Sequence, residues 1–103
     1  METIDIRHGG LTKLAGRRAW AIVGVVASGN LEILLERTAA PEICDVRIET
    51  SAEGFAPTWQ AVIGDIVAGN DAGGLRISIN DSGARPDTVA LRLLQGLRMM
   101  AAA

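Results

Sequence analysis

The sequence of residues 20–36 is WAIVGVVASGNLEILLE, and this stretch decides how the chain folds. Two apolar, strand-like runs, at 19–27 and 31–36, flank a short segment of small and polar residues, which is the pattern of a β-hairpin. In the second run an apolar side chain occupies every second position from Leu31 to Leu35, as in a strand with one buried face. The chain is therefore expected to be built around this hairpin.

The tip of the predicted hairpin is Ser28-Gly29-Asn30. All three residue types favour turns for backbone reasons, so the tip by itself indicates an ordinary turn. The serine stands between Ala27 and Gly29, however, where we expect its hydroxyl to be exposed with little side-chain bulk around it. Such a hydroxyl suits the attachment of a bulky group that must enter the pockets of other proteins.

Periodicity predicts three further elements: a strand at 44–49, a helix at 57–68 and a strand at 75–80. Both strands alternate apolar with polar residues. The helix carries a continuous apolar stripe from Trp59 to Val67. Pro57 stands at its first predicted position and Gly69 directly after its last predicted residue, which are positions that proline and glycine prefer.

The two ends of the chain give weaker patterns. Residues 1–18 are expected to be an irregular segment that leads into the hairpin. Residues 88–94 fit both strand and helical spacing, and we expect a short fifth strand that becomes a helix near Gln95. The element order predicts an α+β fold for a single domain, residues 1–103, in which helices cover one face of a mostly antiparallel sheet of four or five strands in a two-layer sandwich.

Composition excludes several classes of protein. Hydrophobic residues make up 49% of the chain and charged residues 21%, which is typical of a folded domain. The net charge of −2 argues against a nucleic-acid partner, which selects a basic surface. The acidic start and the short apolar runs resemble neither a secretory signal nor a membrane span. We therefore expect a cytoplasmic protein that binds no membrane.

Two residue types that often serve in catalysis or metal binding occur once each. His8 is the only histidine, and no cysteine or acidic cluster lies near it in the sequence. Cys44 is the only cysteine, so the chain has neither a disulfide framework nor a thiolate metal cluster. Since Cys44 falls on the apolar face of its predicted strand, we expect it to be a small core residue.

The remaining motifs indicate ordinary structure. The glycine-rich segment 69–74 follows a predicted helix and precedes a strand, which is the reverse of the order in phosphate-binding loops. Carboxylates that alternate along the strands are expected to face solvent, and Asp81 and Asp87 bracket a predicted turn. No residue is therefore predicted to be catalytic or to bind metal, and Ser28 remains the only candidate for chemistry, as an anchor.

Several stretches, in order, resemble a known family, the acyl-carrier (delta) subunit of malonate decarboxylase. Residues 24–34, GVVASGNLEIL, resemble the sequence around its modified serine. Further similarity occurs at 48–51, 59–60, 79–86 and 89–96. The resemblance spans residues 20 to 97. The acyl-carrier subunit of citrate lyase is similar at a greater distance.

The resemblance implies a specific role. It implies that 2'-(5''-phosphoribosyl)-3'-dephospho-CoA is covalently bound to Ser28 through a phosphodiester, with Ala27, Gly29 and Asn30 as the supporting tip. The arm would carry acetyl and malonyl thioesters, and the chain itself would be non-catalytic. Its partners would be an acetyl-CoA/malonate transferase subunit, the decarboxylase subunits and the prosthetic-group transferase.

Three positions depart from the family pattern. Asn30 stands in place of an aspartate, Ser82 in place of an aromatic residue and Arg85 in place of a threonine. Two alternatives remain open at this point. The chain could be a small α+β interaction module in which Ser28-Gly29-Asn30 is only a turn, or the acyl carrier of a related lyase such as citrate lyase.

Overall fold

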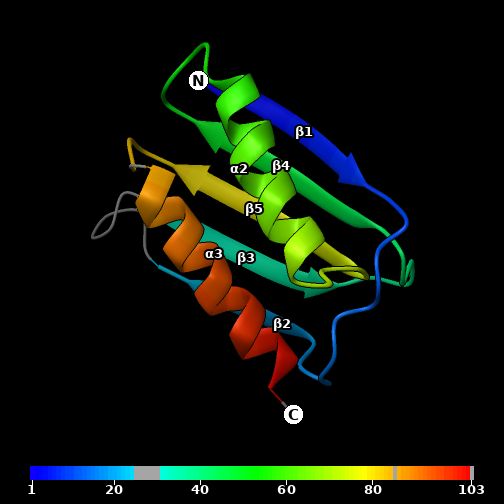
Figure 1. Cartoon of the computed structure of the whole chain (residues 1–103). Coiled ribbons are helices and arrows are strands. Elements are labelled where there is room, and N and C mark those ends of the chain that lie inside the picture. The colour runs from blue at the N-terminus through cyan, green and yellow to red at the C-terminus, as the bar shows by residue number, and fades with distance from the viewer. Residues whose placement is uncertain (25–30, 85, 103) are drawn as a thin grey trace.

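The computed structural model describes residues 1–24, 31–84 and 86–102. In these ranges the chain forms a five-stranded sheet and two helices, an α+β fold (Figure 1). The elements in chain order are β1 (Glu2–His8), β2 (Trp20–Val23), β3 (Leu31–Arg37), β4 (Cys44–Thr50), α2 (Ala56–Gly69), β5 (Leu75–Asp81) and α3 (Pro86–Ala101). The predicted fold class is confirmed.

The strands are arranged in the order β1-β4-β5-β3-β2. β4 and β5 are parallel, and the other three neighbouring pairs are antiparallel. Because a parallel pair needs a crossover, α2 connects β4 to β5. The two parallel strands end side by side, where Thr50 pairs with Asp81, and antiparallel β3 begins opposite the same aspartate at Leu31. We call this end of the sheet the Asp81 edge.

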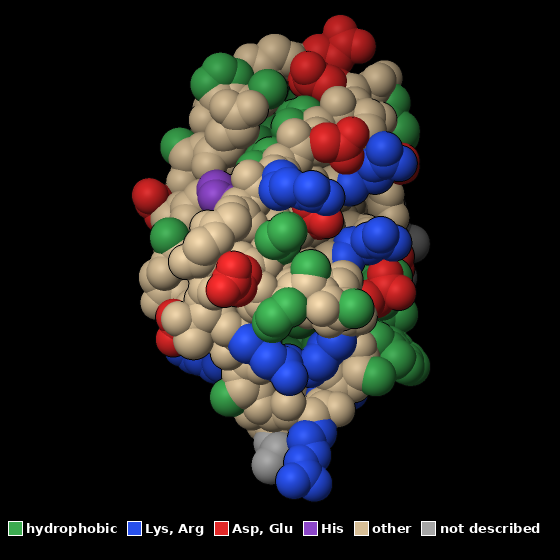
Figure 2. Space-filling model, turned by 90° about the vertical axis from the view of Figure 1, so that its right-hand side faces the viewer, with side chains coloured by type: hydrophobic (Ala, Val, Ile, Leu, Met, Phe, Trp, Pro, Cys, Tyr) green, Lys and Arg blue, Asp and Glu red, His purple; other side chains and the backbone are tan. Residues whose placement is uncertain are grey.

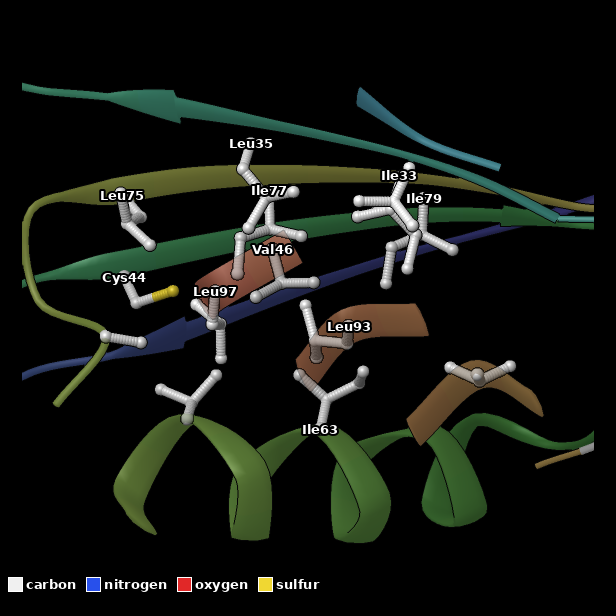
Figure 3. Packing of buried hydrophobic residues seen from close by; sticks show 14 of the residues in the cluster. Ile33, Leu35, Cys44, Val46, Ile63, Leu75, Ile77, Ile79, Leu93 and Leu97 are labelled. Carbon is white, nitrogen blue, oxygen red and sulfur yellow. The ribbon is translucent and has the colours of Figure 1, made fainter. Parts of the chain in front are cut away.

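Both helices lie on one face of the sheet, and the core fills the space between the two layers (Figures 1 and 3). Leu93 and Leu97 of α3 and Ile63 of α2 point toward the strands in Figure 3. The inward-facing strand residues that they meet are fully or almost fully buried: Ile33, Leu35, Val46, Ile48, Ile77 and Ile79. With few aromatic residues, the core consists of close-packed aliphatic side chains.

The prediction of an irregular segment over residues 1–18 is wrong for residues 2–8, which form the edge strand β1. Its sequence, ETIDIRH, alternates apolar with polar residues, and the strand pairs with β4 along its whole length. Ile4 is buried on the helix-covered face. The alternation is visible in the sequence, but the pairing partner lies far along the chain, since Thr3 pairs with Glu49.

The predicted fifth strand at 88–94 is also wrong, because α3 is one continuous helix from Pro86 to Ala101. Residues at helical spacing are buried against the sheet: Val89, Leu93, Leu97 and Met100. Leu91, which a strand would have placed on the same face as Leu93, is 64% exposed. β1 supplies the fifth strand instead.

The helical assignment of α3 predicts different effects for two neighbouring leucines. Leu93→Ala should lower the free energy of unfolding by about 2–5 kcal/mol, because it leaves a cavity in the core. Leu91→Ala, the matched control, should change it by less than about 0.5 kcal/mol. Urea unfolding followed by circular dichroism measures both. Equal losses in the two variants would contradict the helix.

Candidate functional site

The two strands of the predicted hairpin are present as β2 and β3, with Val23 paired to Ile33. The predicted attachment residue, Ser28, and its supporting residues Ala27, Gly29 and Asn30 lie outside the described residues. What the structure describes is the base of the hairpin tip, Gly24 on one side and Leu31 on the other. This base determines where the tip leaves the sheet.

Gly24 is required at the base of the tip for two reasons. Its φ is +78°, a backbone conformation that residues other than glycine adopt only at an energetic cost. A Cβ at this position would also collide with the backbone carbonyl oxygen of Leu31 across the hairpin. The two chain segments therefore approach each other more closely here than any residue with a side chain would allow.

The base of the tip lies at the Asp81 edge, because Leu31 is the pairing partner of Asp81. Asp81 is buried, and both oxygens of its carboxylate accept hydrogen bonds. Thr50 Oγ1 donates to Oδ2 at 2.8 Å, and the backbone N–H of Ala84 donates to Oδ1 at 2.7 Å. The aspartate thus joins the end of β4 to the turn before α3, and its predicted role as a turn residue is confirmed.

An apolar pocket of about 320 Å³ opens beside Asp81, between the first turns of the two helices. We call it the edge pocket. α2 and the residue before it contribute Phe55, Thr58, Trp59 and Val62, α3 contributes Val89, and the adjoining loops and strand end contribute Ala52, Asp81, Gly83 and Ala84. The pocket could not be predicted from the sequence, because its walls come from two separate stretches of the chain, 52–62 and 81–89. The one residue near the pocket that stands out is Phe55, an aromatic residue directly before α2 whose side chain is 53% exposed.

The uncovered face of the sheet carries charged side chains, as the alternation predicted. Arg7 pairs with Asp45 at 2.7 Å, and Arg47 pairs with Asp5 at 2.9 Å. The hydrogen bond from Arg47 lowers the pKa of Asp5. Figure 2 shows positive and negative side chains interspersed on the side of the molecule where β1 lies. Within each pair the two charges neutralise each other, so this is an ordinary solvated face.

His8 and Cys44 are brought opposite each other by the pairing of β1 with β4, although they are far apart in the sequence. Cys44 is fully buried, and burial raises the pKa of its thiol to about 12. A thiol with so high a pKa is not a nucleophile at neutral pH. The His8 ring packs against Gly64 of α2. Cys44 therefore belongs to the core, as predicted, whereas His8 is half-buried and its Nε2 has no hydrogen-bond partner among the described residues.

The glycine-rich segment 69–74 starts at the last residue of α2 and continues as a loop, in which two backbone N–H groups are already used. Gly73 donates to the carbonyl of Thr12 at 2.9 Å and Gly74 to that of Ile43 at 2.9 Å. These donors are not available to a phosphate, which confirms the prediction for this segment. In the described ranges no group of three or more His, Cys, Asp or Glu residues could hold a metal ion.

Two of the three departures from the family pattern, Asn30 and Arg85, fall outside the described residues. The third, Ser82, is exposed in the turn that follows β5. A helix long and apolar enough to cross a bilayer does not occur in the part of the chain that the structure describes.

Comparisons with known proteins agree with the resemblance. Residues 18–100 match the family described as malonate decarboxylase delta subunit (MdcD). The malonate decarboxylase acyl carrier protein of Bradyrhizobium diazoefficiens is 52% identical over 101 residues, which cover 98% of this chain and 96% of that protein. The protein of the same name from Burkholderia cepacia is 56% identical over 81 residues, covering 79% and 74% of the two chains.

A solved structure also matches. The fold is similar, with a TM-score of 0.83 and 37% sequence identity, to a chain in the crystal structure of a Pseudomonas malonate decarboxylase hetero-tetramer in complex with malonate. The match covers 97% of this chain and 99% of that chain. The similarity therefore extends over nearly the whole chain rather than over a single motif.

The close approach at the base of the tip predicts a strong effect of one methyl group. Gly24→Ala should lower the free energy of unfolding by at least about 1 kcal/mol, because the residue has a positive φ and lies against the Leu31 carbonyl. Gly69→Ala is the matched control, since a Cβ there meets nothing within 4 Å. It should leave the stability unchanged or raise it by up to about 1 kcal/mol. Denaturant unfolding of both variants checks this, and a Gly24→Ala protein as stable as the wild type would contradict it.

Proposed function

Because the chain belongs to the malonate decarboxylase delta subunit family and is an acyl-carrier subunit by that membership, we propose that Ser28 is the residue that carries its prosthetic group. The observation that supports this most directly is the hairpin base at Gly24 and Leu31. It closes at the Asp81 edge, so the serine belongs to a connection of six residues, 25–30, that begins and ends at one edge of the sheet.

The group that we propose is 2'-(5''-phosphoribosyl)-3'-dephospho-CoA, joined to Ser28 through a phosphodiester. When bound, it supplies a thiol at the end of a long arm, on which acyl groups are carried as thioesters. The described surroundings fit such a group. Asp81, the buried carboxylate at this edge, is fully hydrogen-bonded, and α2 begins here without an acidic residue in its first turn. The first turn of α2 therefore adds no side-chain repulsion to the phosphates, whereas α3 carries Asp87 in its first turn.

We propose that the chain itself does no catalysis. Two of the described side chains that could act as nucleophile or base are engaged in structure: the Cys44 thiol is buried with a raised pKa, and Asp81 ties a strand end to a turn. A tethered arm supplies instead a high effective concentration of the acyl group at each active site that it reaches.

The proposed partners are the acetyl-CoA/malonate transferase subunit, the decarboxylase subunits and the prosthetic-group transferase, in the cytoplasm. The matching Pseudomonas structure is a hetero-tetramer. The edge strand β2, which leads into the hairpin tip, exposes Trp20 and Ile22 by 57% and 48%. Large apolar side chains that remain exposed together are typical of a surface that another protein covers.

Intact-mass spectrometry tests the attachment site. The chain would be co-produced with its prosthetic-group transferase, and the wild type should gain the mass of the phosphoribosyl-dephospho-CoA group. Ser28→Ala should show no adduct because it lacks the hydroxyl.

Ser82→Ala is the matched control, since Ser82 is an exposed serine after β5 at the same edge. It should be modified like the wild type. A wild-type chain that stays unmodified under these conditions would overturn the proposal and favour the alternative of an interaction module without a cofactor.

A further inference from the structure

We propose that the edge pocket binds the acyl-thioester end of the chain's own arm, and that it accepts a neutral acetyl group but excludes a malonyl group. This inference rests on the proposed attachment of the arm at Ser28. It assigns to the carrier a binding site of its own, with a defined preference for one of its two acyl forms.

Position is the first argument for the edge pocket. Asp81 lines the pocket and is also the pairing partner of Leu31. Neighbouring strands lie about 4.8 Å apart, and the three residues that lead from Leu31 back to Ser28 span at most about 11 Å when fully extended. An arm built from coenzyme A is longer than this separation, so its end can return to the carrier.

The chemistry of the walls is the second argument. Trp59, Val62 and Val89 supply an apolar surface from both helices, and Gly83 and Ala84 leave space where larger residues would fill it. A volume of about 320 Å³ lies within the range of pockets that bind small ligands. It suits a short acyl thioester together with the neighbouring methylene groups of the arm.

Charge determines which acyl group the pocket accepts. Asp81 is the one charged side chain among the described residues that line the pocket, and no Lys or Arg is among them. Its two oxygens accept hydrogen bonds from Thr50 and Ala84. A malonyl group would bring a second carboxylate into an apolar site without a cation to pair with it, which is costly. An acetyl group brings no charge and avoids that cost.

The pocket would therefore separate the two acyl forms of the arm, the acetyl and the malonyl thioester. The acetyl thioester is sheltered from water while the arm rests on the carrier. The malonyl thioester stays outside the pocket, where a decarboxylating partner can take it. The pocket thereby protects the form that must last between turnovers and leaves the reactive form accessible.

Binding of untethered probes tests the pocket independently of Ser28. The unmodified full chain would be titrated with S-acetylpantetheine and S-malonylpantetheine and followed by ¹H–¹⁵N NMR. The acetyl probe should shift the Trp59 indole and the amides of Ala52, Val62 and Ala84, while the exposed Trp20 indole serves as the internal control. The malonyl probe should bind at least about tenfold more weakly. Equal affinity for the two probes, or shifts confined to other residues, would overturn the proposal.

Two substitutions sharpen the test. Thr58→Lys adds a cation at an exposed position of the pocket lining, and it should raise the affinity for the malonyl probe several-fold. Gln60→Lys, exposed on the same helix but outside the lining, should not. A gain of binding cannot arise from misfolding. Equal effects of the two lysines would show general charge attraction and count against the pocket.

The modified protein gives the final readout. In the acetyl-loaded chain the thioester should react with hydroxylamine several-fold more slowly than S-acetylpantetheine in solution. Val62→Phe, which fills the pocket, should remove this protection, whereas the matched Ala61→Phe, at an exposed position of α2, should keep it. An unprotected thioester in the wild type overturns the inference but not the attachment. A chain that cannot be loaded at Ser28 overturns the attachment, while the probe titration still decides the pocket.

Discussion

The parallel pairing of β4 with β5 is the constraint on which the other features of the molecule depend. Parallel neighbours cannot be joined by a tight turn, so α2 must cross one face of the sheet between them. Both strands then end at the same edge, and both helices begin there. β3, antiparallel to β5, starts at this edge as well. The hairpin base, Asp81 and the edge pocket are neighbours for this reason.

The two faces of the sheet are used differently. The covered face holds the aliphatic core and also takes up Cys44 and His8, the two residues that could have suggested catalysis. The uncovered face holds charge pairs such as Arg7 with Asp45. The Cys44 thiol is thus committed to packing and the Arg7 and Asp45 charges to each other, which suits a protein whose proposed chemistry is carried by an attached arm.

Local sequence patterns are sufficient to predict a helix or strand where its own periodicity determines it. The second hairpin strand, the strand at 44–49, the helix at 57–68 and the strand at 75–80 are observed close to their predicted bounds. The first hairpin strand, predicted over 19–27, is observed over Trp20–Val23, and residues 25–27 lie outside the described residues. Residues 2–8 and 88–94 were predicted wrongly. The first is a strand whose partner lies far along the chain. The second fits two periodicities, and only burial of Val89 and Leu93 against the sheet selects the helix.

The sequence by itself determined the fold class, the hairpin and Ser28 as the candidate anchor. Alternation and turn preferences are properties of short segments, and the resemblance to a family is read from the order of residues along the chain. The tertiary structure alone decided that Leu31 pairs with Asp81, that Gly24 must lack a side chain and that a pocket opens between the starts of α2 and α3. These features arise from contacts between segments distant in the chain. Their geometry depends on strand order and helix packing, which local periodicity does not specify.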